Sequence, residues 1–308
     1  MTPIRIGTCS WADDALTKYW YPKEVSSAEA RLRYYAEHFS TVEVDSTYYR
    51  LPDETMVSRW VERTPADFVM HVKAFGVMTR HPVKVEQLPP DLRDAAPVDE
   101  RGRVDRPPRE FRAEVFRRFR RALEPLRETG KLGGILLQFP PYVVSKDVSV
   151  DYLRWAVAQL DGDRALVEFR HRSWLDDDHR DATLKILEEL GASHVIVDAP
   201  KTDAKNVVPT VVAATSPLAY IRFHGRNAAT WNARGGSASD RFDYLYSNEE
   251  LEEWVEPLKQ LGKNADEVYV LFNNNRWSRT PQGGFAAQAP ANARALQGIL
   301  DFSGVGTR

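Results

Sequence analysis

The chain has 308 residues, of which 43% are hydrophobic and 28% charged, and its formal net charge is -2. This composition is ordinary for a globular protein, and the small net charge excludes a global attraction to nucleic acid or anionic membranes. Residues 1–6 lack the apolar stretch of a signal peptide, and no segment approaches the ~20 apolar residues of a membrane helix. The single cysteine, Cys9, has no partner for an intrachain disulfide. We therefore expect a cytoplasmic protein that does not bind membranes.

Short β-branched runs alternate with stretches of helical periodicity along the chain. The runs predict eight strands: Ile4–Thr8, Thr41–Asp45, Phe68–Lys73, Gly134–Phe139, Ala165–Arg170, His194–Asp198, Ala219–His224 and Val268–Asn273. The stretches predict helices at Ser27–Phe39, Thr55–Arg63, Asp151–Leu160, Asp181–Leu190 and Asn248–Leu261. Such alternation implies parallel strands joined by crossover helices. Eight units favour a closed (β/α)8 TIM barrel in one domain, residues 1–308, with an open doubly wound sheet as the alternative.

Residues 75–130 interrupt the alternation. The part from His81 to Pro108 is rich in proline and charge and predicts an irregular excursion over the barrel. The following part predicts a helix, because apolar residues recur at helical spacing from Phe111 to Leu126. This helix and the segment before it are rich in arginine, from Arg101 to Arg127. A basic patch could grip phosphates. The alternative is a solvated helix face on which glutamates pair with the arginines.

Every predicted strand except the first ends in a charged or amide side chain. In a TIM barrel the C-terminal ends of the strands and the loops after them surround one site. The residues expected there are Trp11, Glu43, Asp45, Tyr49, Arg50, Lys73, His81, Gln138, Glu168, Arg170, His171, Trp174, Asp198, Arg222, His224, Arg226, Asn273 and Asn275. A buried charge is tolerated when it is paired, hydrogen-bonded or bound to a ligand. The set therefore predicts a polar pocket, although a Glu168–Arg222 ion pair could serve the barrel alone.

Three chemistries fit these residues. Carboxylates and imidazole from different strands could hold a divalent metal for hydrolysis, the candidates being Glu43, Glu168, Asp198 and His224; no metal-binding histidine spacing supports this, and the cofactor stays unknown. A carboxylate pair such as Glu168 with Glu43 or Asp198 could perform general acid–base catalysis, assisted by His224 or Lys73. The cations outnumber what the carboxylates require, which indicates an anionic ligand; they are Lys73, Arg170, Arg222 and Arg226.

Two further features accompany the predicted pocket. Aromatic residues in the strand-to-helix loops, among them Trp11, Tyr49 and Trp174, could stack on bases or sugars or could simply pack against helices. The polar stretch from Gly225 to Asp240, which contains Gly235 and Gly236, is long enough to form a mobile lid.

Several ordered motifs resemble the domain-of-unknown-function family 72, also called YecE-like proteins. They include Gly7-Thr8-Cys9-Ser10-Trp11, Val42 to Pro52, Leu137-Gln138-Phe139-Pro140-Pro141, Val167 to Trp174, Arg222-Phe223-His224-Gly225-Arg226 and Phe272-Asn273-Asn274-Asn275. The resemblance runs from about Ile4 to Leu300 and implies a TIM barrel. It implies little about activity; such barrels are likened to endonuclease IV, which suggests DNA processing by fold analogy alone. This chain departs from the family pattern in having Asp45 where Asn is usual.

We expect an enzyme, hydrolase-type, that binds an anionic, phosphate-bearing substrate such as a nucleic acid or nucleotide. Glu168, Asp198 and Glu43 would supply acid–base or metal-ligand function, and the arginines would position the anion. The alternatives are a nucleic-acid-binding module without chemistry, and a sugar-phosphate isomerase or glycosidase. The last is favoured if the mouth holds a carboxylate pair but no metal. The oligomeric state is not predicted.

Overall fold

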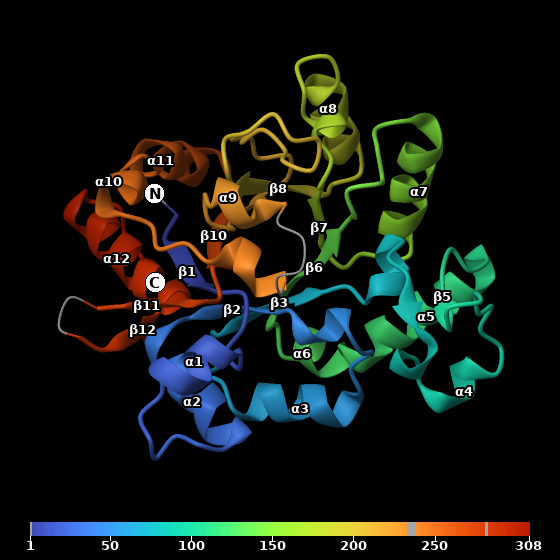
Figure 1. The fold of residues 1–308 in the computed structure, drawn as a ribbon, viewed down its shortest axis with the longest axis horizontal. Helices are drawn as coiled ribbons and strands as arrows, with labels where there is room; N and C mark the ends of the chain where they lie inside the picture. Colours follow the sequence, from blue (N-terminus) through green and yellow to red (C-terminus); the bar gives the residue numbers. More distant parts are fainter. Residues whose placement is uncertain (1, 233–237, 281–282) are drawn as a thin grey trace.

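The computed structural model describes residues 2–232, 238–280 and 283–308. Its centre is a closed barrel of eight parallel strands with helices around it (Figure 1). The strands are β1 (Ile4–Thr8), β2 (Thr41–Val44), β3 (Val69–Lys73), β6 (Leu132–Gln138), β7 (Ala165–Glu168), β8 (Ser193–Asp198), β9 (Leu218–Phe223) and β10 (Glu267–Phe272). Each lies within two residues of its predicted position. The predicted (β/α)8 TIM barrel is therefore confirmed.

The strands follow one another around the barrel in chain order, and β10 closes it by pairing with β1. Arg222 on β9 contacts Glu43 of β2 and Glu168 of β7, neither of which neighbours β9. Arg222 therefore points into the barrel. Its register partner on β8 is Val197, and partners across a sheet face the same side. Asp198, the next residue, consequently faces outward.

The expected helices form, with one exception. They are α2 (Ala28–His38), α3 (Glu54–Glu62), α7 (Asp147–Ala158) and α8 (Arg180–Glu189). The stretch expected as one helix from Asn248 is divided into α10 (Asn248–Glu252) and α11 (Val255–Asn264). Trp254 lies at the division, where its indole N–H donates to Asp198. This buried contact joins residues 56 positions apart, so local periodicity cannot predict it.

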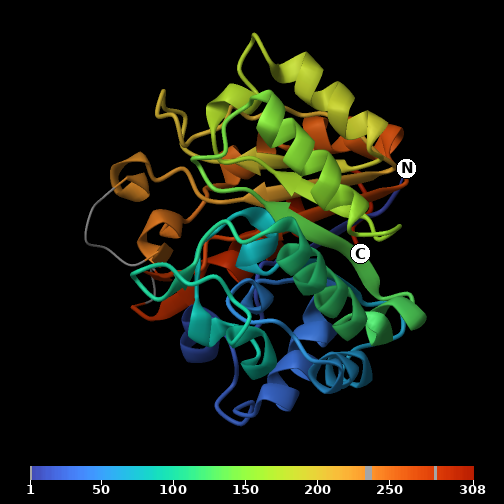
Figure 2. The same ribbon diagram turned by 90° about the vertical axis from the view of Figure 1, so that its right-hand side faces the viewer.

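Other elements were not predicted. They are α1 (Asp14–Tyr19), α9 (Ala228–Trp231), the hairpin strands β11 (Trp277–Arg279) and β12 (Phe285–Ala287), α12 (Gln288–Phe302), and short 3-10 helices at Ser46–Tyr48, Arg172–Trp174 and Ala238–Phe242. Helix α12 packs on β1 and β10. The chain then returns to β1, where the amide of Ile4 donates to the carbonyl of Gly306. Both termini therefore lie at the end of the barrel where the strands begin (Figure 2).

The excursion between β3 and β6 contains short elements followed by the arginine-rich helix. The elements are the 3-10 helices Gly76–Thr79 and Val85–Gln87, β4 (Val83–Lys84), α4 (Pro90–Arg93), β5 (Arg103–Val104), α5 (Arg109–Ala122) and α6 (Glu124–Glu128). The helix expected from Phe111 to Leu126 is divided at Leu123 into α5 and α6, and α5 buries Val115, Phe116 and Phe119 as its apolar spacing predicts. In Figure 1 the excursion lies to one side of the barrel, beside α7.

A histidine fills the barrel interior below the polar site. His71 on β3 is fully buried between Tyr220 and Tyr269, with ring centroids 4.7 and 4.3 Å away. Gly133 lets β6 approach this ring, since a Cβ there would lie 2.4 Å from the His71 ring carbon Cε1. Burial lowers the pKa of His71 to about 3. The imidazole is therefore neutral at physiological pH and acts as packing.

In the part of the chain that the structure describes, no helix combines the length and apolar character needed to cross a membrane.

Candidate functional site

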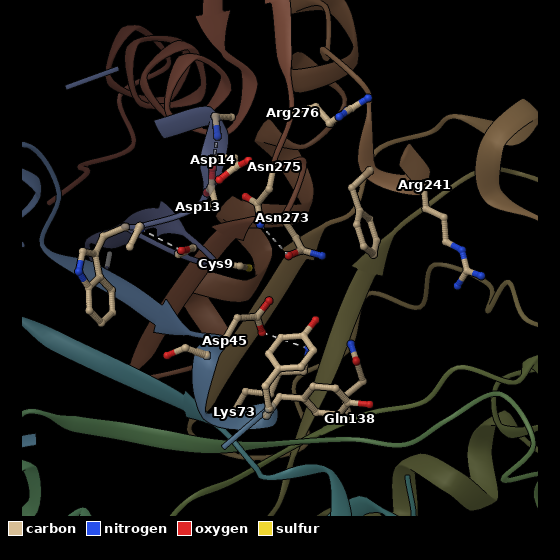
Figure 3. Close-up of a pocket in the computed structure, with 18 of the residues that line it drawn as sticks. Cys9, Asp13, Asp14, Asp45, Lys73, Gln138, Arg241, Asn273, Asn275 and Arg276 are labelled. Carbon is tan, nitrogen blue, oxygen red and sulfur yellow. Dashed lines mark hydrogen bonds and ion pairs between the residues drawn. The ribbon is translucent and has the colours of Figure 1, made fainter. Parts of the chain in front are cut away.

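A cavity of about 880 Å³ opens where the barrel strands end. Figure 3 shows side chains from separate strands around this space. Nine of its lining residues were predicted for the site: Trp11, Asp45, Tyr49, Lys73, His81, Gln138, Arg170, Asn273 and Asn275. This size suits a ligand of small-molecule dimensions.

An arginine between two glutamates forms the layer beneath the cavity. Arg222, Glu43 and Glu168 are each fully buried. The Arg222 guanidinium donates to Glu43 at 2.6 Å and to Glu168 at 2.5 Å, and the Tyr220 hydroxyl donates to Glu43 at 2.8 Å. Burial opposes ionisation of Arg222, yet the two carboxylates hold its pKa well above the usual value. Such a buried triad is stable only when intact, because any member left alone is an uncompensated charge.

Glu168 is fully occupied by protein partners. Besides Arg222, it accepts from the amide of Gln138 at 2.8 Å, lies 3.2 Å from His224 Nε2, and pairs with Arg170 Nε at 2.5 Å. Burial alone would raise the pKa of Glu168, but Arg170 and Arg222 hold it well below its usual range. A carboxylate so firmly ionised and saturated is poorly placed to exchange protons. The geometry makes Glu168 the residue that positions the groups above it.

Asp45 and Lys73 form the ion pair that faces the cavity. Lys73 Nζ lies 3.1 Å from Asp45 Oδ1, and both side chains retain some exposure, 12% and 25% respectively. Figure 3 shows the two converging from adjacent strands. Burial would raise the pKa of Asp45, but Lys73 and Arg222 lower it below its ordinary value. An ionised carboxylate beside an ammonium group gives the site both a proton acceptor and a proton donor.

Glu43 lies beneath that pair and is coupled to it. Burial raises the pKa of Glu43 to about 7, against the attraction of Arg222, and the negative charge of Asp45 raises it further. When two carboxylates interact, one proton belongs to the pair rather than to either residue. The Glu43–Asp45 pair can therefore hold one proton near neutral pH.

Arg170 presents an unoccupied guanidinium fork to the cavity. Its Nε is held by Glu168, and its side chain is 16% exposed. The two terminal amino groups donate no hydrogen bond to a described residue, and the one ion pair of Arg170 among those residues is the pair with Glu168. Trp231 lies 5.8 Å below the guanidinium carbon as a cation–π partner. A planar fork in this state matches the oxygens of a phosphate or carboxylate.

Neutral histidines and amides complete the wall. Burial lowers the pKa of His224 to about 3, and its ring joins Glu168 to the Asn273 amide, 2.9 Å from Nδ1. Burial also lowers the pKa of His81 to about 3, and its Nδ1 lies 2.9 Å from the Thr79 hydroxyl. Asn275 lies 3.5 Å from Asn273. His81, Asn273 and Asn275 line the cavity, so they can exchange hydrogen bonds with an uncharged part of a ligand.

The structure places Asp198 outside this site, which corrects its expected position. Its carboxylate accepts from Arg226, from the Tyr246 hydroxyl at 2.7 Å and from the Trp254 indole at 3.0 Å. Arg226 also pairs with Glu253 at 3.0 Å. Asp198 ends its strand on the outward parity, so that it meets α10 and α11 rather than the barrel interior. Strand β8 consequently gives the cavity no charged residue.

Three other expected binding residues do not line the cavity. Arg50 is exposed and lies beyond the rim. His171 bonds locally to Ser173, 2.9 Å from its Nδ1. Trp174 is buried, stacks on Phe169 with centroids 4.3 Å apart, and donates to the carbonyl of Val143. These residues follow strand ends in sequence, but the chain turns away before their side chains reach the mouth.

The cavity also contains residues that were not predicted. Cys9, which follows β1, lines it and is buried, and burial raises the pKa of its thiol well above the usual value. The loops after β9 and β10 add Trp231, Arg241, Phe242, Arg276 and Trp277, and no periodic pattern in those loops predicts where their side chains point. The segments after β1 and β2 add Asp13, Asp14, Lys18 and Tyr48, among others. Cys9 lies two residues after Gly7 and so faces the same side of β1. This alternation could have predicted that the thiol reaches the cavity.

The predicted lid, Gly225–Asp240, is described only in part. Its first part contains α9, and the 3-10 helix Ala238–Phe242 overlaps its end; Trp231 and Phe242 line the cavity with ring centroids 6.1 Å apart. Gly235 and Gly236 lie outside the described residues.

The expected metal ligands do not form an open metal site, because Glu43, Glu168 and His224 lie in one network around Arg222 and Asp198 lies apart from them. Glu168 is saturated by nitrogen donors, Glu43 is held by Arg222 and Tyr220, and Asp198 lies outside the barrel. His224 offers Nε2 to Glu168. Across residues 2–232, 238–280 and 283–308, no group of three or more His, Cys, Asp or Glu side chains is arranged to hold a metal ion. The residues present do not fit a metal centre.

The expected excess of cations is also wrong as stated. Each of the four cations has a carboxylate partner: Lys73 has Asp45, Arg170 and Arg222 share Glu168, and Arg226 has Asp198. The sequence shows charges but not their pairing, and Asp198 neutralises Arg226 away from the mouth. An attraction for anions therefore depends on the free fork of Arg170 and on Arg241, which lines the cavity and has no ion pair with a described residue.

Together these features define a TIM-barrel protein with a polar, arginine-containing cavity at the C-terminal mouth of its barrel. The chain belongs to the family described as "Protein of unknown function DUF72", whose model matches residues 5–306. The family expected from the sequence motifs is confirmed.

The relatives cover almost the whole chain. The UPF0759 protein YunF of Bacillus subtilis (strain 168) is 33% identical over 312 aligned residues, which cover 99% of this chain and 98% of that protein. A crystal structure of the DUF72 family protein EF0366 from Enterococcus faecalis V583 matches with a TM-score of 0.76 and 28% identity, covering 97% of this chain and 95% of that one. The DUF72 family protein TM1631 from Thermotoga maritima MSB8 matches with a TM-score of 0.74 and 29% identity, covering 97% and 99%.

Proposed function

We propose that this protein is an enzyme that binds a small molecule carrying a sugar-phosphate group and transfers protons within it. The observation that supports this most is the free guanidinium fork of Arg170 beside the Asp45–Lys73 pair. The fork would bind the phosphate, and the pair would act on the adjacent sugar carbons or hydroxyls. A sugar phosphate occurs both as a free phosphosugar and within a nucleotide, and the cavity is large enough for either.

The remaining wall residues suit the uncharged part of such a ligand. Neutral His81 can donate one hydrogen bond to a carbonyl or hydroxyl while its other nitrogen faces Thr79. The amides of Asn273 and Asn275 can orient hydroxyl groups. Aromatic rings at the rim, including Tyr49, which is 59% exposed, can stack on a sugar or a base.

Proton transfer between carbon and oxygen is favoured over hydrolysis by this arrangement. An ionised carboxylate, an ammonium group and a neutral imidazole around one cavity can remove a proton next to a carbonyl and return it elsewhere. Hydrolysis assisted by a metal would need open ligands, and the candidate carboxylates Glu43, Glu168 and Asp198 are already paired with arginines. The isomerase alternative therefore becomes the leading reaction class. We keep the cytoplasm as the proposed compartment, since the one cysteine is a buried free thiol.

Ligand-induced stabilisation tests the binding step. Sugar phosphates and nucleoside monophosphates, each compared with its dephosphorylated form, would be added during thermal unfolding. A true ligand at 100 times its Kd stabilises the folded state by about 2.7 kcal/mol. We expect Arg170→Gln to abolish this stabilisation. Arg50→Gln is the matched control, because Arg50 is exposed and lies outside the cavity. Equal stabilisation by the dephosphorylated forms would refute the proposal.

Turnover of the ligand so found tests the chemistry. We expect Asp45→Asn and Lys73→Met each to reduce kcat by roughly 10²–10⁴-fold, the usual contribution of a general acid or base. Solvent deuterium exchange into recovered substrate would report proton abstraction directly. Retention of full activity in both variants would remove the pair from the mechanism.

A further inference from the structure

The arginines of α5 fall into two groups, one paired with carboxylates and one without carboxylate partners. Arg117 pairs with Glu114 at 2.6 Å, Arg118 with Asp91 at 2.5 Å and Arg120 with Asp163 at 3.1 Å. This end of the helix is the solvated, charge-paired face that was the alternative to a phosphate-binding patch. Most of its positive charge is neutralised locally, so it has little to offer an external anion.

The other end of α5 holds arginines without carboxylates. Arg80, Arg109 and Arg112, which we call the arginine cluster, form no ion pair with any residue in the described ranges. They gather over two rings of α7: Arg80 lies 5.3 Å and Arg112 4.9 Å from the Tyr152 ring, and Arg109 lies 5.7 Å from the Trp155 ring. Helices α5 and α7 lie on the same side of the barrel in Figure 1. Three like charges are thus held together without a carboxylate partner, by ring contacts and by a hydrogen bond from Arg112 Nε to the carbonyl of Pro107 at 2.9 Å.

The helix terminus adds to this positive field. Arg109 and Arg112 lie in the first turns of α5, whose N-cap, Pro108, provides no side-chain hydrogen bond. A helix N-terminus carries partial positive charge and unsatisfied N–H groups, where cationic side chains are unfavourable and anions are favourable. Glu110 in the same turn pairs with none of the cluster. Arg80 also adopts a left-handed backbone, φ 68°, which is uncommon outside glycine and concentrates at functional sites.

The backbone at Arg80 connects the arginine cluster to the cavity wall. Arg80 is followed directly by His81, which lines the cavity. The Tyr142 hydroxyl donates to the carbonyl of Arg80 at 2.6 Å, and Tyr142 follows the cavity-lining Pro141. The Tyr142 ring is 51% exposed at this junction. A chain of phosphates leaving the cavity past His81 would pass the exposed Tyr142 before it reached the arginine cluster, whose side chains do not themselves line the cavity.

We propose that the arginine cluster binds the phosphate backbone of a single-stranded nucleic acid, one nucleotide of which enters the cavity. The nucleotide in the cavity rests on the proposed function. The contact with the phosphate backbone rests only on the arginine cluster. A single strand is favoured over a duplex because a cavity of this size accepts one unstacked nucleotide. The exposed Tyr142 and the arginine planes can stack on neighbouring bases.

Fluorescence anisotropy of a labelled oligothymidylate tests the inference on the intact protein. We expect Arg109→Ala/Arg112→Ala to weaken binding roughly tenfold or more and to reduce the slope of log K against log salt by about 1.4, since each phosphate contact on a single strand contributes about 0.7. Arg117→Ala/Arg118→Ala on the same helix is the matched control and should change neither quantity appreciably. Thermal unfolding of each variant confirms that it is folded.

Several results would overturn the inference. These are equal weakening in the control variant, binding that does not respond to salt, duplex binding as tight as single-strand binding, or capture by anionic vesicles without binding of the oligonucleotide. Suppose that a mononucleotide stabilises the wild-type protein and that the cluster variant binds the oligonucleotide normally. The proposed function would then be supported, and binding of the phosphate backbone by the arginine cluster would be refuted. Loss of oligonucleotide binding in the cluster variant, with no stabilisation by any sugar phosphate, would support the cluster and refute the proposed function.

Discussion

Two buried carboxylate clusters lie at the same end of the barrel, only one of them beneath the cavity. The inner cluster joins Glu43, Glu168 and Arg222, and the outer cluster joins Asp198 and Arg226. Both combine short ion pairs with tyrosine or amide hydrogen bonds. They differ by the face of the sheet on which they lie, because Asp198 has the outward parity of β8. Parity, more than charge or burial, decides whether a polar residue at a strand end can serve a ligand.

The largest effect is expected from the arginine at the centre of the inner cluster. Arg222→Met leaves Glu43 and Glu168 buried without their cation, which should reduce the free energy of unfolding by about 3–5 kcal/mol. It should also abolish ligand stabilisation, since Glu168 then no longer has a fixed position from which to hold Arg170. Urea unfolding measures the first effect. A variant as stable as the wild-type protein would show that the inner cluster is not a stabilising unit.

Acidification should change the stability of the protein around the inner cluster, because buried histidines lie next to it. His71 and His224 have pKa values lowered by burial to about 3, whereas an unfolded histidine titrates near 6.5. As the pH falls below 6.5 the unfolded chain binds protons first, so each group lowers stability by up to about 1.4 kcal/mol per pH unit. Glu43 acts oppositely: its raised pKa, about 7, makes its contribution largest below about 4.5 and lost as the pH rises through 7.

Burial also lowers the pKa of His81 to about 3 and that of His194 to about 4, and it raises the pKa of Asp13 to about 6. Four such histidines outweigh the two carboxyl groups, so we expect the melting temperature to fall between pH 6.5 and 4. His224→Gln keeps a polar side chain between Glu168 and Asn273 but cannot titrate, and its melting temperature should depend less steeply on pH. An unchanged slope in His224→Gln would show that the imidazole is charged in the folded protein.

A substitution in the outer cluster tests whether Asp198 is independent of the ligand site. Asp198→Asn removes the charge that pairs with Arg226 and should cost about 1–3 kcal/mol of stability. Ligand stabilisation should persist, because Asp198 does not line the cavity. Loss of ligand stabilisation in a folded Asp198→Asn protein would mean that the outer cluster belongs to the functional site after all.

The smallest effect on the free energy of unfolding is expected for His71, which lies in the barrel interior below both clusters. Neither ring nitrogen of His71 has a hydrogen-bond partner among the described residues. His71→Leu replaces an unsatisfied polar ring by an apolar side chain, which should be neutral or stabilising by less than about 1 kcal/mol at pH 7 and more stabilising at pH 5. Thermal unfolding at the two pH values measures it. Clear destabilisation at both would assign a structural role to the imidazole.

Local sequence information was sufficient for the barrel itself. Each strand combines a β-branched run with turn residues at its ends, and eight such runs separated by amphipathic stretches limit the fold to few topologies. The convergence of Asp45, Lys73, Gln138, Arg170 and Asn273 followed from the barrel rule that strand ends surround one site. The division of Asn248–Leu261 into two helices at Trp254 did not follow, because the apolar periodicity continues across it from Leu251 to Leu261.

Periodicity and residues close together in the chain were enough to predict the eight barrel strands, the fold, the family and nine of the residues that line the cavity. The pairing of the charges depends on the three-dimensional arrangement of the strands. Arg222 contacts Glu43 across 179 positions, and Arg226 rather than a ligand neutralises Asp198. Charge pairing in a closed barrel depends on register and parity between distant strands. A linear pattern of charges therefore shows that a polar site exists, but not which of its cations remain free for a substrate.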